Sequence, residues 1–175
     1  MPVSALAQVE YRVVATSRTS TTEKEMNEAA DAGFRFGGVM GGDTLFGGSE
    51  VVTVMHREPG SDPGRFAYKL LATTRTGTMQ KELQEAGDAG FEYRGQTVFK
   101  TRFGGKEAVV ILERDRDLKD RPAFEYRLLA TSKTSTMQKE LGESGEAGYQ
   151  FVGLTVADTA LGGSEVVSIL RRVRK

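Results

Sequence analysis

The chain has 175 residues, 38% of them hydrophobic, and it carries 24 basic and 24 acidic side chains. This composition is typical of a folded globular protein, and the balanced charge excludes a global field that would recruit nucleic acid or an anionic membrane. The chain has no cysteine, which excludes thiol catalysis, zinc fingers and iron–sulfur clusters. Its single histidine is too few for a histidine-based metal site. We therefore expect no cofactor, no metal and no binding of nucleic acid.

The first residues of the chain carry the only hint about its location. They end in Ala5-Leu6-Ala7, followed by Gln8, a small-x-small pattern of the kind that signal peptidases cleave. This pattern predicts a signal-peptide remnant and an exported protein, periplasmic or extracellular. If the pattern arose by chance, the protein is cytoplasmic. No stretch approaches the ~18 apolar residues that cross a bilayer, so we expect no membrane span.

A sequence of about 50 residues then occurs three times, opening at Tyr11, Tyr68 and Tyr126. Such repetition indicates one supersecondary unit that is used three times. A lone unit of this size buries too little surface to be stable without a disulfide, metal or partner, so the units are expected to share a core. Polar segments that contain proline mark the boundaries. The divisions are the leader 1–7, repeat 1 at 8–57, a linker at 58–65, repeat 2 at 66–114, a linker at 115–123, and repeat 3 at 124–175.

The first half of each repeat predicts a strand and then a helix. Residues 66–73, for example, are rich in large apolar and aromatic side chains, which is typical of a strand. The helix start is expected at a capping-box spacing, in which a Ser or Gly stands three positions before Glu or Gln. These pairs are Ser20 with Glu23, Gly77 with Gln80, and Ser135 with Gln138. One apolar stripe, such as Met79, Leu83 and Ala86, indicates a helix that covers one face of a sheet. The helices are expected to end at Gly33, Gly90 and Gly148.

The second half of each repeat predicts a hairpin, because paired glycines between two extended runs can both adopt positive φ in a tight turn. The pairs are Gly47-Gly48, Gly104-Gly105 and Gly162-Gly163. A helical crossover returns the second strand parallel to the first, which leaves room for the third strand antiparallel between them. We therefore expect an α+β fold of three tandem β-α-β-β repeats, each a helix on a three-stranded mostly antiparallel sheet, joined into one pseudo-threefold body. Joining the sheets edge to edge would protect their edges, in a ring or barrel; a closed ring and an open array both remain open here.

The segment ELQEAGDAGFEYRG, residues 82–95, resembles the hallmark of a family of small bacterial domains of unknown function. That hallmark is a Leu-Asn-x-Leu-Gly-x-x-Gly-Trp-Glu stretch between an opening strand that contains Tyr and a closing hairpin that ends in Lys or Arg. Leu83, Gly87, Gly90 and Glu92 match it, whereas Phe or Tyr replaces Trp. The resemblance covers each repeat and implies a β-α-β-β fold without an activity. Residues 15–30 also look like the opening of dodecin, a small flavin-storing β-α-β-β protein, but the chain lacks the Trp that dodecins stack against flavin.

The loop that leads into each helix is the candidate ligand site. Several hydroxyls, one cation and the free N–H groups of the helix converge there, which suits phosphate, sulfate or a carboxylate. If the three copies closed around an axis, the three loops could hold a multivalent anion. The alternative is that the hydroxyls only cap the helix and the cation is exposed. The residues are Thr16, Arg18, Thr19, Thr21, Thr73, Arg75, Thr76, Thr78, Thr131, Lys133, Thr134 and Thr136.

The sequence offers no histidine-based catalytic site. His56 is the only histidine, and because Glu113 and Arg171 replace it in the other repeats, we expect a solvent-facing position there. Without a second histidine, a Ser-His-Asp triad is unavailable as well. The sequence therefore predicts a non-enzymatic binding or self-assembly module that acts through sheet edges or the helix-entry loops. Its partner would be another copy or another protein, with a small anion as a candidate ligand.

Two other interpretations are kept. The first is a small-ligand, dodecin-like carrier with a pocket between helix and sheet. Its cavity would be lined by Phe34, Phe91 and Tyr149. The second is an enzyme that uses the repeated Glu and Lys side chains.

Overall fold

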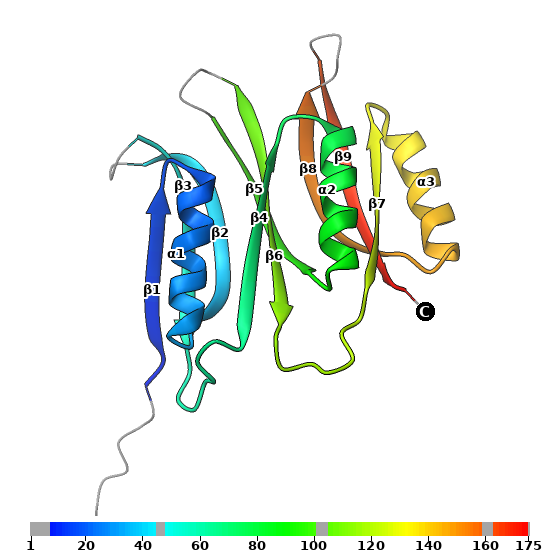
Figure 1. The fold of residues 1–175 in the computed structure, drawn as a ribbon. Helices are drawn as coiled ribbons and strands as arrows, with labels where there is room; N and C mark the ends of the chain where they lie inside the picture. The colour runs from blue at the N-terminus through cyan, green and yellow to red at the C-terminus, as the bar shows by residue number, and fades with distance from the viewer. Residues whose placement is uncertain (1–7, 45–47, 101–104, 159–162, 175) are drawn as a thin grey trace, which may run out of the picture.

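A computed structural model describes residues 8–44, 48–100, 105–158 and 163–174 (Figure 1). Within them the chain forms three β-α-β-β units in succession, as the repeats predict. Unit 1 contains β1 (Glu10–Thr16), α1 (Thr19–Asp31), β2 (Arg35–Thr44) and β3 (Gly48–Arg57). Unit 2 contains β4 (Phe66–Thr73), α2 (Thr76–Asp88), β5 (Glu92–Lys100) and β6 (Lys106–Asp115). Unit 3 contains β7 (Phe124–Thr131), α3 (Thr134–Glu146), β8 (Gln150–Asp158) and β9 (Ser164–Val173).

Each unit has one three-stranded antiparallel sheet with its last strand in the centre. The strand orders are β1-β3-β2, β4-β6-β5 and β7-β9-β8. The predicted position of the third strand between the other two is therefore confirmed. The second strand of each unit carries a bulge after its first two paired residues, for example between Phe36 and Gly38. The predicted glycine pairs fall partly outside the described residues, which do not include Gly47, Gly104 or Gly162.

The helix ends agree with the sequence, and the helix starts do not. Gly33, Gly90 and Gly148 follow the helices with φ of 88°, 81° and 83°, the left-handed conformation expected of a glycine stop. The helices begin two residues earlier than the capping-box pattern predicts, with Arg18, Arg75 and Lys133 at the N-cap positions, and none of these three side chains caps its helix. The capping-box prediction is therefore wrong, and two of its side chains, Glu23 and Gln80, form their hydrogen bonds with the next unit, as described below.

The three units pack into one body through a shared core. Met26 and Met55 of unit 1 lie in one cluster with Tyr68 and Ile111 of unit 2. A second cluster joins Met79 and Leu83 of unit 2 to residues of unit 3. We call the sheet face that carries the unit's own helix its helix face, and the opposite face its back face. In both clusters the helix face of one unit contacts the back face of the next.

The units form an open row in which the three sheets stay separate. Figure 1 shows α1 between β1 and β4, α2 between β4 and β7, and α3 at the far end. The middle sheet is covered on both faces, so Ala108 to Leu112 of β6 are all at most 2% exposed. The prediction that the sheets join edge to edge is wrong for the described residues, because helix side chains bond to the outer edges of β4 and β7 instead.

Candidate functional site

The first junction, between units 1 and 2, is held by hydrogen bonds from α1 to the backbone of β4. The Asn27 amide accepts a bond from the N–H of Tyr68 and donates one to its carbonyl, each 2.9 Å long. Glu23 Oε2 accepts a 2.7 Å bond from the N–H of Leu70. Edge strands expose unpaired backbone groups, and here the helix of the preceding unit satisfies them.

The second junction, between units 2 and 3, repeats this arrangement with glutamines. Gln80 accepts a 2.8 Å bond from the N–H of Leu128 and donates a 2.9 Å bond to the Tyr126 carbonyl. Gln84 accepts a 3.1 Å bond from the N–H of Tyr126. Glu23 and Gln80, which the capping-box pattern assigned to the helix start, therefore hold the next unit in place.

An aromatic ring from each unit lies against a glycine on the back face of the next. A Cβ added to Gly95 would lie 3.0 Å from the Phe36 ring, and one added to Gly153 would lie 2.3 Å from the Tyr93 hydroxyl. Only glycine leaves room for the ring at these two positions. The third glycine of the series is Gly38, and a Cβ there would meet nothing within 4 Å. Phe151, the third aromatic of the series, is exposed.

The tyrosine that opens a repeat completes the junction. The Tyr68 hydroxyl accepts a 2.8 Å bond from the N–H of Phe36, and the Tyr126 hydroxyl accepts a 2.7 Å bond from the N–H of Tyr93. In both cases the donor lies beside the bulge of the second strand, where the regular pairing is interrupted. Burial raises the pKa of both tyrosines, so they stay neutral hydrogen-bonding groups.

Each junction also contains a part-buried ion pair, and the signs of its two partners are reversed between the first junction and the second. In the first, Arg35 Nη2 of unit 1 lies 2.8 Å from Glu113 Oε1 of unit 2. In the second, Glu92 of unit 2 lies 2.6 Å from Arg171 Nη1 of unit 3. The prediction of a solvent-facing position at His56, Glu113 and Arg171 is therefore wrong for the last two residues. They lie on back faces that the preceding unit covers.

Among the acidic residues that the structure describes in the junctions, Glu113 has the most constrained carboxylate. It is 5% exposed and also accepts a 2.7 Å bond from the Tyr68 hydroxyl, while Arg94 lies 2.8 Å away. Burial alone would raise the pKa of Glu113, but the bonds from Arg35 and Tyr68 and the charge of Arg94 together lower it below the usual value. The carboxylate is thus held ionised as a structural group.

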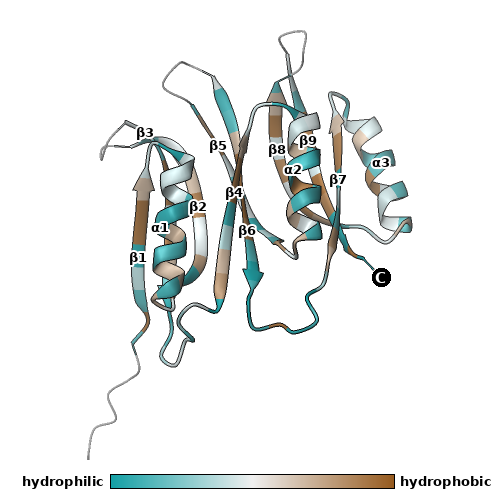
Figure 2. Cartoon of the chain, in the orientation of Figure 1, coloured by the Kyte–Doolittle hydropathy of each residue, from teal (hydrophilic) through white to brown (hydrophobic). Residues whose placement is uncertain are grey.

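Residues that are buried at the junctions have exposed equivalents on the two end surfaces of the row. Tyr11 is 71% exposed, whereas its equivalents Tyr68 and Tyr126 are 3% and 2% exposed. At the other end Val166 is 39% exposed, whereas its equivalent Val51 is fully buried. Of the ten exposed large hydrophobic side chains that the structure describes, eight lie on these surfaces, and Figure 2 shows hydrophobic stretches on β1 and β8. The back-end surface consists of Tyr11, Val13, Met40 and Val54; the helix-end surface consists of Phe151, Leu154, Val156 and Val166.

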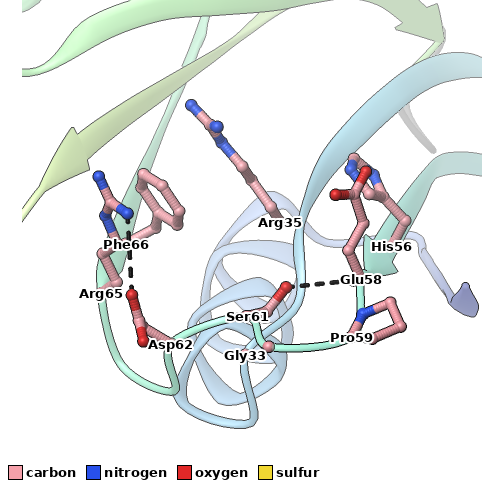
Figure 3. Close-up of a pocket in the computed structure, with 10 residues that line it drawn as sticks. Gly33, Arg35, His56, Glu58, Pro59, Ser61, Asp62, Arg65 and Phe66 are labelled. Carbon is pink, nitrogen blue, oxygen red and sulfur yellow. Dashed lines mark hydrogen bonds and ion pairs between the residues drawn. The ribbon is translucent and has the colours of Figure 1, made fainter. Parts of the chain in front are cut away.

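A polar hollow of about 260 Å³ lies where the linker 58–65 meets the first junction (Figure 3). Arg35 points across it, between Phe66 on one side and His56 on the other. The guanidinium of Arg35 stacks 4.2 Å above the Phe66 ring and bonds to Glu113, so its charge is already engaged. The hollow is therefore a feature of the junction, with its walls built from the linker.

The predicted anion-binding residues lie at the start of each helix, side by side along one edge of the row (Figure 1). Thr16, Thr73 and Thr131 each donate a bond to a carbonyl of their own loop, at Arg18, Arg75 and Lys133. Thr76 donates a 3.0 Å bond to Glu165 of unit 3, so a carboxylate of the chain itself sits at the start of α2. The row is open, and the loops therefore do not surround an axis. Binding of a small anion at these loops stays a prediction.

The three aromatic residues proposed for a carrier cavity each lie beneath a guanidinium. Arg57 stacks over Phe34 at 4.8 Å, Arg114 over Phe91 at 4.6 Å, and Arg172 over Tyr149 at 4.5 Å. The arginine comes from the last strand of the same unit, and Arg57 and Arg172 also donate to the carbonyl of the residue before the glycine stop. These rings therefore take part in ending the helix.

The comparisons with known proteins add no family to this description. No protein-family model matches the chain, and no match was found among curated proteins or solved structures. In the part of the chain that the structure describes, no helix is long and apolar enough to cross a membrane, and no cluster of three metal-binding side chains occurs. What the chain shows on its own is three tandem β-α-β-β units, two buried junctions between them, and two open end surfaces.

Proposed function

We propose that the protein is a non-enzymatic binding or assembly module that acts through its two end surfaces. The observation that carries this proposal is the contrast between equivalent positions, which are buried at the junctions and exposed at the ends. Contiguous exposed apolar side chains on a folded protein mark interaction sites. The outer edge of β1 strengthens the case, because no helix of the described residues caps it as α1 caps β4 and α2 caps β7.

Light scattering of the wild-type protein over a hundredfold range of concentration tests the proposal. The mean mass should rise with concentration, and Met40→Lys, which places a charge on the back-end surface, should suppress the rise. The matched control is Leu118→Ser, which removes an exposed apolar side chain from a linker, away from both ends. A mass of one chain at every concentration, or an association that Met40→Lys and Leu118→Ser affect equally, would contradict the proposal.

Export and family membership belong to the same proposal. The pattern Ala5-Leu6-Ala7 lies outside the described residues, so export to the periplasm or beyond rests on the sequence alone. The likeness to the small bacterial β-α-β-β domains is supported by the observed element order and remains a hypothesis beyond it. A dodecin-like carrier is the second interpretation, and the arginines stacked over Phe34, Phe91 and Tyr149 do not favour it.

A further inference from the structure

We propose that the partner of each end surface is the other end surface of a second copy of this chain. The copies would associate head to tail, so that the helix face of unit 3 covers the back face of unit 1 in the next molecule. This inference rests on the proposed function and deepens it by naming the partner. The template is the junction that the chain already forms twice within itself.

The contacts of the two internal junctions have free counterparts at the ends. The Phe36 ring lies on Gly95 and the Tyr93 ring on Gly153, and by the same +57 or +58 residue offset Phe151 corresponds to these rings. Its socket would be Gly38 of the next copy, where a ring finds open space. The chain thus keeps an exposed ring at one end and an empty glycine position at the other.

The polar contacts can be transferred in the same way. The Tyr11 hydroxyl corresponds to those of Tyr68 and Tyr126, and it would accept the bond from the N–H of Phe151. Gln138 corresponds to Gln80 and is exposed in α3, where it would bond to the backbone at Val13 of the next copy. These contacts would satisfy the outer edge of β1, which no helix of the described residues caps.

Two positions show that the copy-to-copy junction is weaker than the internal ones. The equivalent of Asn27 and Gln84 in α3 is Gly142, which has no side chain to hold the strand. The ion pair of the junctions becomes Gln150 opposite His56, and because Gln150 carries no charge, the two side chains can share only a hydrogen bond. The expected association is therefore reversible and depends on concentration, whereas the internal junctions are permanent.

Two blocked variants of the full chain test the proposal by sedimentation velocity. Gly38→Glu fills the socket at the back end, and Phe151→Glu removes the ring at the helix end; both positions are open in the single chain, so each variant should fold as the wild type. Each variant alone retains one working surface and should stay monomeric. An equimolar mixture should form a one-to-one dimer, because the intact ends are complementary, and the two glutamates repel at the alternative contact. Phe151→Ala should weaken wild-type association at least about tenfold.

The outcomes separate this inference from the proposed function. If either blocked variant dimerises alone and the mixture gains nothing, like ends meet each other: assembly through the ends stands, and the head-to-tail inference fails. If the wild type and the mixture both remain monomeric at all concentrations, the inference and the assembly function fail together. A wild-type mass that levels off indicates a closed ring of copies, and one that keeps rising indicates an open filament; both support head-to-tail contact.

Discussion

Replacing Gly87 by alanine tests how closely α2 approaches β7. A Cβ on Gly87 would lie 2.4 Å from the carbonyl oxygen of Phe124 and 2.9 Å from a ring carbon of Tyr126. Because the oxygen belongs to the backbone, helix and strand must separate by roughly 1 Å to reach an ordinary C···O contact of about 3.3 Å. Such overpacking costs about 1–3 kcal/mol. The 3.3 Å bond from Gln84 to the same carbonyl is strained as well, at a further cost of about 0.5–1 kcal/mol.

The gain in helix propensity works against this cost and can be measured separately. Alanine in place of glycine inside a helix stabilises by about 1 kcal/mol, so Gly87→Ala should lower the free energy of unfolding by about 2 kcal/mol. Gly145→Ala is the matched control, because it occupies the same position in α3 and its Cβ would meet nothing within 4 Å. That variant should gain about 1 kcal/mol. The two variants should therefore differ by about 3 kcal/mol in opposite directions.

Urea unfolding followed by circular dichroism measures both values at one low protein concentration, which keeps association from adding stability. The midpoints should move apart while the slopes stay equal. If both alanines stabilise the protein by the same amount, α2 does not press on β7, and the close junction between units 2 and 3 described above is incorrect.

Three further predictions concern the shared core. Glu113→Ala should cost about 2 kcal/mol, because two partly exposed arginines and the Tyr68 hydroxyl lose their acceptor. Glu28→Ala, at an exposed helix pair, should cost at most about 0.5 kcal/mol, and equal losses in urea would contradict a structural role for Glu113. The pKa of Glu113 lies below its ordinary value of 4.5 in the folded protein. The ionised Glu113 therefore stabilises the fold above pH 4.5, and this stabilisation is lost as the pH falls through the lower folded-state pKa. The free energy of unfolding of the wild type should fall below pH 4.5, and Glu113→Gln should reduce this pH dependence. The excised segment 65–116 should show no cooperative thermal transition, because Tyr68 and Ile111 would lose their cover, and a sharp melt of a monomer would contradict a shared core.

The elements within a unit follow from local sequence patterns, which is why they were predictable. The helix stops at Gly33, Gly90 and Gly148 need only a left-handed residue, and the strand order needs only a right-handed crossover and a short hairpin. Both properties are carried by residues close together in the chain, so a single repeat is enough to find them.

The junctions depend on residues about 30 to 80 positions apart, and no local pattern carries them. Glu23 and Gln80 stand at capping-box spacing, yet their side chains accept hydrogen bonds from the backbone of the next unit's edge strand instead of from their own helix start. The change from His56 to Glu113 and Arg171 across the repeats is also what a solvent-facing position that tolerates any side chain would show. A signal was present, since Arg35 and Glu92 change sign in the opposite sense, but only the structure shows that these positions face each other.

That reversal of sign has a consequence for how the units are ordered. If the helix face of unit 1 met the back face of unit 3, Arg35 would face Arg171, and if unit 2 met a second unit 2, Glu92 would face Glu113. Like charges that meet in a part-buried contact repel each other, so the charges disfavour wrong pairings that the ring-on-glycine contacts alone would accept. In the pair left for the ends, Gln150 is uncharged, so no like charge opposes His56. Since both internal junctions share the same ring-on-glycine contacts, affinity comes from this feature that repeats, and the order of the units comes from the charges that differ.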